Sequence, residues 1–133
     1  MNTQMNNQLC YLTYSANDEA WGTIITTAGF QHISPHASYP PSQHPKNYNF
    51  CPQNGRILNE YQFVYIVKGS GTFISDHCKK RSVKTGDLLI LFPGEWHNYY
   101  PDIDSGWDEY WVGFKGSYME HLINKHFFSP ENP

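Results

Sequence analysis

The segment from Gly86 to Pro101, GDLLILFPGEWHNYYP, constrains the fold of this chain more than any other feature. A turn glycine, an apolar run over Leu88–Phe92, a Pro93-Gly94 corner and a second run beginning near His97 describe two strands joined by a sharp bend. Such strands need partners to pair with and a core to cover. We therefore expect a small β-barrel, with His97 at the start of the second strand and facing the interior.

Composition limits the class of protein. The chain has 133 residues, which is the length of one domain with a single core. Aromatic residues make up 17% of it and charged residues only 16%, a balance that favours strands over helices. The net charge is −3, and the longest basic run is Lys79–Arg81. This excludes an electrostatic footprint for nucleic acid within these residues.

The cysteines and the N-terminal residues indicate the cellular compartment of the protein. Cys10, Cys51 and Cys78 are odd in number and have neither pairwise nor metal-like spacing. The start, MNTQMNNQLCYL, lacks the basic and apolar regions of a secretory signal, and no window reaches the length of a membrane span. We expect a cytoplasmic protein with free thiols and no membrane partner.

The order of the expected elements follows from turn signals and alternation. Residues 1–20 are polar and without period, Trp21–Phe30 is dense in β-branched and aromatic residues, and Gln31–Glu60 is a long irregular excursion that holds five of the nine prolines. Short strands are expected at Tyr61–Val67, Thr72–Ser75, Arg81–Lys84, Leu88–Phe92, His97–Tyr100 and Asp108–Phe114, with turns at Lys68–Gly71, Asp76–Cys78 and Thr85–Asp87. The pattern predicts a mainly β barrel or jelly roll.

The C-terminal segment changes period. In Gly116–Phe127 the residues Tyr118, Leu122 and Ile123 recur on one helical face, with Met119 beside them. We expect one amphipathic helix whose apolar face packs on the barrel, on another subunit or on residues outside this sequence.

Gly86, Gly94 and His97 also resemble the second motif of the cupins, with the corner proline displaced by one position. In metal-dependent cupins a first motif, ending here at Gly69, supplies two histidines and a carboxylate. The corresponding positions hold Gln62, Leu58 and Arg56, or Ile57 and Gly55 with the other permitted spacing. Glu60 and the histidines of the proline-rich excursion could substitute, but no pair of them has ligand spacing.

One imidazole does not hold a divalent ion, because three or four donors are the usual minimum. We expect no metal and no cofactor. His97 is then either a hydrogen-bonding group in a pocket or a core histidine.

A longer resemblance covers about half the chain. The runs EYQFVYIVKGSGTF, VKTGDLLILFPGEWHNY and WDEYWVGFKG, within Asn59–Phe128, are similar to the effector-binding domain of AraC-family transcription regulators. The resemblance implies a metal-free cupin barrel over residues 21–115 that binds a small effector, often a sugar. It implies an N-terminal arm over 1–20 and, over 116–133, the start of a helical dimerisation or linker region. The family's DNA-binding domain, with two helix-turn-helix units, would lie outside this sequence, and the partners expected are a carbohydrate effector and a second copy of the full-length protein.

The resemblance also implies ligand-binding residues. They are Arg56, His97, Tyr99, Glu109 and Trp111. Trp111 occupies the position of an indole that stacks on a sugar ring, and Tyr99 should lie on the same side of its strand as His97. Glu109 replaces a histidine of the family with a carboxylate, and Arg56 corresponds to an arginine clamp after a two-residue gap.

Each of these residues also has a purely structural interpretation. Trp111 and Tyr99 could belong to the barrel core, Glu109 could pair with a lysine, and Arg56 could hold the proline-rich segment. For Trp96 and Trp107 packing or surface positions are favoured over ligand contact.

Three functions are compatible with these features. The first is a non-catalytic ligand sensor that regulates transcription through an attached DNA-binding domain. The second is a cupin enzyme, an isomerase, epimerase or oxygenase, that uses His97 with Tyr99 or Glu109 as an acid and base. The third is a dimerisation module whose barrel is packed shut.

Overall fold

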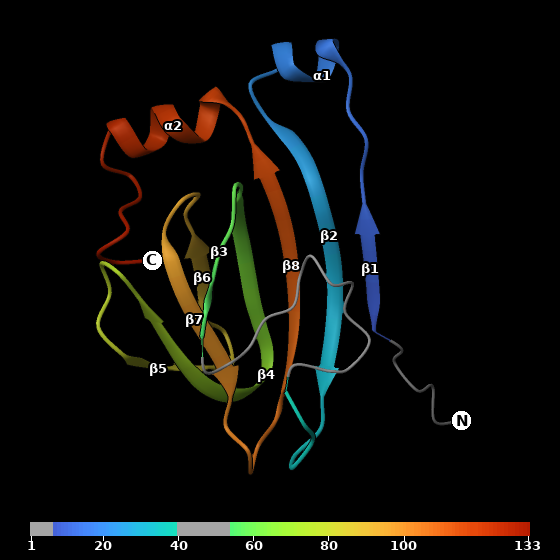
Figure 1. Cartoon of the computed structure of the whole chain (residues 1–133), viewed down its shortest axis with the longest axis vertical. Coiled ribbons are helices and arrows are strands. Elements are labelled where there is room, and N and C mark those ends of the chain that lie inside the picture. Colours follow the sequence, from blue (N-terminus) through green and yellow to red (C-terminus); the bar gives the residue numbers. More distant parts are fainter. Residues whose placement is uncertain (1–6, 40–53) are drawn as a thin grey trace.

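The computed structural model describes residues 7–39 and 54–133, whose strands form an antiparallel sheet that curls into a barrel (Figure 1). The strand order is β1-β2-β8-β4-β7-β3, with β5 and β6 also paired to β4. The strands are β1 (Gln8–Tyr11), β2 (Ile24–Ile33), β3 (Arg56–Ile57), β4 (Tyr61–Ser75), β5 (Arg81–Lys84), β6 (Leu88–Leu91), β7 (Trp96–Pro101) and β8 (Trp107–Lys115). A C-terminal helix, α2 (Ser117–Asn124), follows β8. This is the mainly β, jelly-roll architecture with a terminal helix that the sequence predicts.

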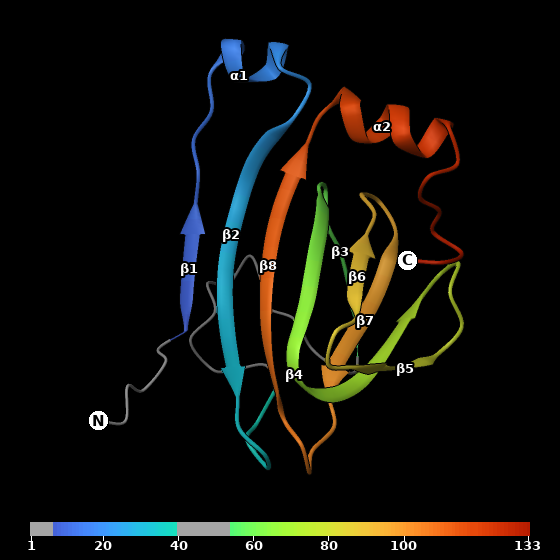
Figure 2. The ribbon, with the colours of Figure 1, turned by 180° about the vertical axis from the view of Figure 1, so that it is seen from behind.

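Strand β4 joins the two sides of the barrel. Its first half pairs with β6 and β8, and its second half pairs with β5 and β7 (Figure 2). The predicted turn at Lys68–Gly71 is wrong, because these residues bend a continuous strand instead of reversing it. A register shift between Ile66 and Lys68 marks a bulge, and Gly69 has φ +90° in a place where a Cβ would clash with the Gly106 carbonyl oxygen.

The other two turns predicted in this part of the chain, Asp76–Cys78 and Thr85–Asp87, are present. The Asp76–Cys78 turn is closed by a hydrogen bond from the Ser75 amide to the Cys78 carbonyl at 3.0 Å, and Thr85–Asp87 connects β5 to β6. Strand β2 is displaced by three residues from the expected Trp21–Phe30, because Trp21 caps the preceding helix. Most of the proline-rich excursion, residues 40–53, lies outside the described residues.

The N-terminal segment has more structure than its composition suggests. Strand β1 pairs with β2, with Gln8 opposite Phe30, and a short helix α1 (Ala16–Ala20) follows it. Ser15 and Asp18 form a capping box, in which the Ser15 amide donates to the Asp18 carboxylate at 2.7 Å and the Asp18 amide donates back to the Ser15 hydroxyl at 3.4 Å. This capping signal is present in the sequence as Ser15-Ala-Asn-Asp18.

Two apolar clusters lie on opposite faces of the sheet. The inner cluster lies inside the barrel and consists of Ile33, Val64, Ile66, Phe73, Cys78, Val83, Leu89, Leu91, Tyr99 and Trp107. The outer cluster joins Tyr61, Ile90, Phe92 and Phe114 to Met119 of α2, with Leu122 and Ile123 at its edge. The partner of the helix is therefore the barrel. Tyr118 does not belong to the buried face and is 59% exposed, because the face that packs has positions 119, 122 and 123.

The helices and the cysteines bear on location and on thiol chemistry. Within residues 7–39 and 54–133, neither helix has the length and apolar character that a membrane crossing requires. Cys10 is exposed, Cys78 is buried, and both are free thiols. Cys51 lies outside the described residues.

Candidate functional site

Arg56, His97 and Tyr99 meet inside the barrel. Strand β3 pairs with β7 so that Arg56 stands opposite His97, and Tyr99 follows on the same face of β7. The Arg56 Nε donates to His97 Nε2 at 3.3 Å and its Nη2 donates to the Tyr99 hydroxyl at 2.8 Å. The His97 and Tyr99 rings are nearly parallel, with centroids 6.2 Å apart. One short strand pairing thus assembles three of the five predicted residues.

His97 is a neutral imidazole in this arrangement. Its Nδ1 donates to the Glu95 carbonyl oxygen at 3.2 Å, so its Nε2 keeps the lone pair that accepts from Arg56. Burial, and then the neighbouring Arg56 guanidinium, lower the pKa of His97 to about 3. The ring is therefore an oriented, uncharged member of a hydrogen-bond chain.

Glu109 belongs to the opposite wall, on β8. It pairs with Gln31 of β2 and Ile66 of β4, and it is 3% exposed. Burial raises the pKa of Glu109 to about 8, although the Arg56 guanidinium acts against the shift. Within the described parts of the chain its Oε2 has no hydrogen-bond partner. The side chain is a mainly protonated acid at neutral pH with one unsatisfied oxygen.

Trp111 is two residues further along the same inner face of β8. It pairs with Gly29 of β2 and with the buried Val64 of β4, and its half-buried indole packs against the inner cluster. A Cβ at Gly29 would clash with the indole ring, so only glycine lets the ring lie against β2. Trp111 and Glu109 therefore share one wall, whereas Arg56 and its partners occupy the facing sheet.

Two further aromatic residues complete this wall. Tyr39 lies edge-on to Trp107, with ring centroids 6.4 Å apart, and burial together with the Glu109 charge raises its pKa well above the ordinary value. Trp107 is 1% exposed and packs on Tyr99, and its Nε1 lacks a hydrogen-bond partner among residues 7–39 and 54–133. Trp107 is thus core packing, as favoured from the sequence, and also a buried donor. Tyr39 was missed because it lies in an irregular segment, where no period predicts the direction of a side chain.

A second polar group lies beyond Trp111 on the inner face. The Glu60 carboxylate accepts hydrogen bonds from the hydroxyls of Thr26 and Thr27 and from Gln62 Nε2, the last two at 3.3 and 3.0 Å. Glu60 is 8% exposed, and a Cβ at Gly113 would stand 2.6 Å from its Oε1. The cupin resemblance brings in Glu60 and Gln62 only as possible metal ligands, but alternation along β4 could have placed Gln62 inside the barrel.

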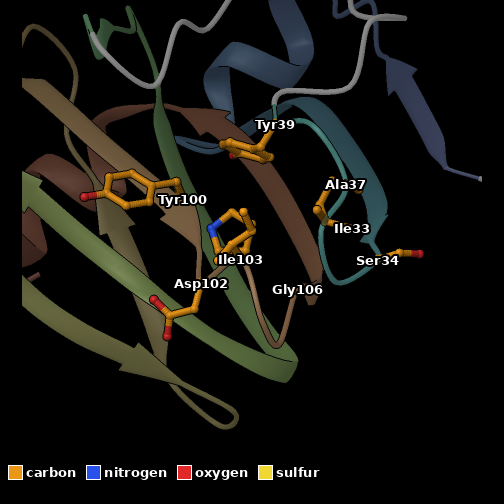
Figure 3. Close-up of a pocket in the computed structure, with 9 residues that line it drawn as sticks. Ile33, Ser34, Ala37, Tyr39, Tyr100, Asp102, Ile103 and Gly106 are labelled. Atoms are coloured by element: carbon orange, nitrogen blue, oxygen red, sulfur yellow. The ribbon is translucent and has the colours of Figure 1, made fainter.

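A pocket of about 230 Å³ opens at one end of the barrel (Figure 3). Its lining comes from the end of β2 and the segment after it, and from the end of β7 and the β7–β8 loop: Ile33, Ser34, Ala37, Tyr39, Tyr100, Pro101, Asp102, Ile103 and Gly106. None of the five predicted residues lines it. Tyr39 belongs both to this pocket and to the surroundings of Glu109.

The residues present do not fit the metal of the cupin enzymes. The first-motif position at Arg56 places a guanidinium on His97 Nε2, the atom that would coordinate an ion, and a fixed positive charge there opposes a cation. Gln62 hydrogen-bonds Glu60, and Ile57 is 60% exposed. In the described residues no group of three or more His, Cys, Asp and Glu side chains is arranged to hold a metal.

Solved structures similar to this barrel are cupins. A cupin protein from Bacteroides fragilis has 18% identity and a TM-score of 0.50 over 71% of this chain and 66% of that one. A predicted oxalate decarboxylase from Thermotoga maritima has 16% identity and a TM-score of 0.51 over 82% and 80%. YhaK from Escherichia coli has 11% identity and a TM-score of 0.57 over 84% of this chain but only 45% of its own. At these identities the similarity establishes the cupin fold alone.

Sequence comparison is more specific. No curated protein matches the chain. The family model of the AraC-like ligand-binding domain matches residues 35–132, which include strands β3 to β8 and all five predicted ligand-binding residues. The chain belongs to the AraC-like ligand-binding domain family.

Proposed function

We propose that this chain is the ligand-sensing domain of a transcription regulator, and that it binds a small polar effector, a sugar or sugar derivative, inside the barrel. The observation that carries the proposal is a group of polar side chains on facing walls: the buried His97 and Tyr99 with the half-buried Arg56 on one wall, and the buried Glu109 on the other. A barrel that served only as a core would be filled with apolar side chains, since buried polar groups cost free energy.

The site suits binding better than catalysis. A base needs a free lone pair and a pKa near the working pH, but the Nε2 of His97 accepts from Arg56 and its pKa is about 3. Burial raises the pKa of the Tyr99 phenol well above its ordinary value. Glu109, with a pKa of about 8, is the one group of the predicted site whose pKa would suit an enzyme, and it lacks a matching base in the arrangement described.

The rest of the chain would transmit the effect of a bound ligand to the DNA-binding domain of the full-length protein. Residues 21–115 would form the effector-binding barrel and 116–133 the start of a helical region that dimerises the full-length protein and leads to its DNA-binding domain. Helix α2 packs on the outer face of β4 and β8, whose inner face carries the site. A ligand that shifts β8 would thereby change the position of α2. In the arm, strand β1 pairs with β2, and its Leu9 stands opposite Gly29, the partner of Trp111.

A thermal-shift screen followed by titration calorimetry tests the proposal. The panel consists of neutral pentoses and hexoses, sugar acids and amino sugars. We expect one class to raise the melting temperature and to bind with one site per chain, and Arg56→Gln to weaken binding at least about tenfold. Lys79→Gln, a distant exposed cation, is the matched control and leaves binding unchanged.

Two results would contradict the proposal. The first is the absence of any stabilising ligand from the whole panel. The second is near-stoichiometric iron, manganese or zinc in protein purified without chelators, which would favour the cupin enzyme.

A further inference from the structure

We propose that the pocket at the end of the barrel is a second binding site, and that it takes a ligand with a single aromatic ring and small substituents. The site is separate from the polar side chains on the inner walls, because none of the five residues predicted to bind the effector lines this pocket. The inference therefore goes beyond the proposed function and does not depend on it. It follows from the volume of the pocket, the chemistry of its lining and the way its walls are held.

The volume of the pocket matches one ring. The pocket measures about 230 Å³. An apolar cavity of about 150 Å³ is enough to bind benzene, so this pocket has room for one benzene ring with one or two small substituents. It is smaller than the pockets of about 300–1,000 Å³ that hold drug-sized ligands. Its size therefore favours a ligand with one ring over a larger one.

The polar side chains of the lining have partners outside the pocket. The Asp102 carboxylate accepts a hydrogen bond from the Ser70 hydroxyl at 2.7 Å, and the Ser34 hydroxyl lies 2.9 Å from His32 Nε2. Figure 3 shows both groups turned away from the other labelled side chains. The side chains that remain to contact a ligand are mainly apolar or aromatic: Ile33, Ala37, Pro101, Ile103, Tyr39 and Tyr100.

This lining distinguishes between two kinds of ring. A sugar ring would bury hydroxyl groups against aliphatic side chains and lose their hydrogen bonds to water, which costs free energy. An aromatic ring buries only apolar surface there, and it gains edge-to-face or offset contacts with the rings of Tyr39 and Tyr100. The pocket therefore suits an aromatic ring, in contrast to the polar side chains on the inner walls.

The walls of the pocket are held in place by backbone hydrogen bonds. The His36 amide, in the segment after β2, donates to the carbonyl oxygen of Ile103 in the β7–β8 loop at 2.7 Å. The loop also closes on itself, because the Gly106 amide donates to the Asp102 carbonyl oxygen at 2.9 Å. Walls that are already ordered bind a small ligand without the entropic cost of ordering them.

One wall residue has an unfavourable backbone conformation. His36 has φ +60°, in the left-handed region that is costly for a residue with a side chain. Such conformations persist where the surrounding structure imposes them, and they are concentrated at ligand-binding and active sites. The conformation of His36 is thus an observation independent of the lining that favours a binding site at this end of the barrel.

Tyr39 connects the pocket to the core of the barrel. Its ring lines the pocket and lies edge-on to Trp107, with centroids 6.4 Å apart. Trp107 packs on Tyr99 at 5.9 Å, and the Tyr99 hydroxyl accepts from Arg56. A ligand that contacts Tyr39 therefore lies at one end of a series of packed rings that reaches the inner walls, and the indole signal of Trp107 should respond to it.

Nuclear magnetic resonance on the whole chain tests the inference, with p-cresol as the probe and the isoleucine methyl groups labelled with carbon-13. Ile33 and Ile103 line the pocket, so the ring current of a bound aromatic ring should shift their signals. We expect these shifts to saturate with a Kd on the order of 0.1–1 mM, as a ligand of eight non-hydrogen atoms allows, and Trp107 to shift with the same Kd. D-Glucose, a polar ring, should not shift the signal of Ile103.

Ile103→Ala tests the assignment of the site. Ile103 is 66% exposed, so its truncation should cost little stability. It should weaken p-cresol binding, followed through the Ile33 signal, about fivefold. Ile57→Ala truncates an isoleucine of similar exposure, 60%, that lies on β3 outside the pocket, and this matched control should leave the affinity unchanged.

Three results would overturn the inference. They are shifts of Ile33 and Ile103 that do not saturate, shifts as large at Ile57 as at Ile103, and a p-cresol affinity that survives in Ile103→Ala. A shift of Ile103 by D-glucose as large as that by p-cresol would also overturn the proposed ligand class. Each of these results leaves the proposed function standing, because that function depends on the inner walls.

Discussion

The two faces of β4 and β8 differ although their residues alternate along the same strands. On the outer face, Tyr61 and Phe114 stack with ring centroids 5.7 Å apart and are covered by Met119 of α2. On the inner face the neighbours of these residues are Gln62 and Gly113, close to the carboxylate of Glu60. The outer face buries apolar side chains alone, whereas the inner face buries polar groups beside the apolar side chains of Val64, Ile66 and Trp107.

This difference separates stability from function. Apolar contacts on the outer face stabilise the fold because burial removes apolar surface from water. Acids and hydrogen-bonding groups on the inner face oppose folding unless they are satisfied, so their presence is best explained by a ligand. The predictions below test this separation, in decreasing order of the expected effect.

Glu109 should make the protein less stable at alkaline pH. Its pKa is raised from 4.5 to about 8 by folding, so the native state binds the proton more tightly than the unfolded state does. The stabilisation is complete below pH 4.5 and is lost as pH rises to 8, on the order of 4–5 kcal/mol in total. Urea unfolding between pH 6.5 and 9 should show the last part of this fall, about 2 kcal/mol, in wild type and a nearly flat profile in Glu109→Gln. Parallel profiles would contradict the burial of this acid.

His97 should have the opposite effect at acidic pH. Folding lowers its pKa from 6.5 to about 3, so the unfolded state takes up the proton first. This stabilisation is complete above pH 6.5 and is lost as pH falls towards 3, by a total on the order of 4–5 kcal/mol. The measurement is the slope of unfolding free energy between pH 6.5 and 4, which should be smaller in His97→Gln. An equal slope in both proteins would show that the imidazole accepts a proton in the native state.

Met119→Ala tests the outer face. Met119 is 4% exposed and joins α2 to the apolar cluster of the sheet, so truncation leaves a cavity and should cost about 2–4 kcal/mol. Urea unfolding gives this value at one pH, and Tyr118→Ala, on the exposed side of α2, should cost well under about 1 kcal/mol. Ligand affinity of the folded fraction should remain within about twofold. A large loss of affinity in Met119→Ala would show that the two faces are not separable.

Ser15→Ala tests a region that belongs to neither face. The Ser15 hydroxyl caps α1 in a reciprocal pair with Asp18, and its loss should cost about 1 kcal/mol at most. Because α1 contains no buried residue, the effect should appear as faster amide exchange in α1 without a change in ligand binding. Uniformly faster exchange through β4 and β8 would contradict this local role.

Much of this fold could be predicted from short-range signals, and the exceptions have physical causes. The run from Gly86 to Pro101 and the turn at Asp76–Cys78 contain their own turn chemistry, so β6 and β7 were located within one or two residues. The sequence predicts a chain reversal at Gly69, where the structure has a bend in a continuous strand. A glycine permits either conformation, and only the pairing of β4 with both β7 and β8 determines which one forms. Tyr118 was placed on the buried face because a short helix leaves its rotation undetermined until it packs.

The site was predictable in part for a similar reason. Alternation places Glu109 and Trp111 on one face of β8, and His97 and Tyr99 on one face of β7. The meeting of Arg56 with His97 depends on a two-residue strand that no pattern marks. The position of Tyr39 beside Trp107 depends on a contact between residues distant in sequence, and so does the interaction of Glu60 with Thr26 and Thr27. Sequence periodicity carries no information on such contacts.

The central claim is that a small polar ligand binds against the inner wall, and the four tryptophan indoles test it directly. In a spectrum of protein labelled with nitrogen-15 at the indoles, a saturating ligand should shift the signals of Trp107 and Trp111. The signals of Trp21, which is exposed at the end of α1, and Trp96, whose Nε1 donates to the Asn54 carbonyl at 2.8 Å, should stay in place. Trp→Phe variants assign the four signals. Shifts confined to Trp21 or Trp96, with Trp107 and Trp111 unmoved by a ligand that binds, would contradict the claim.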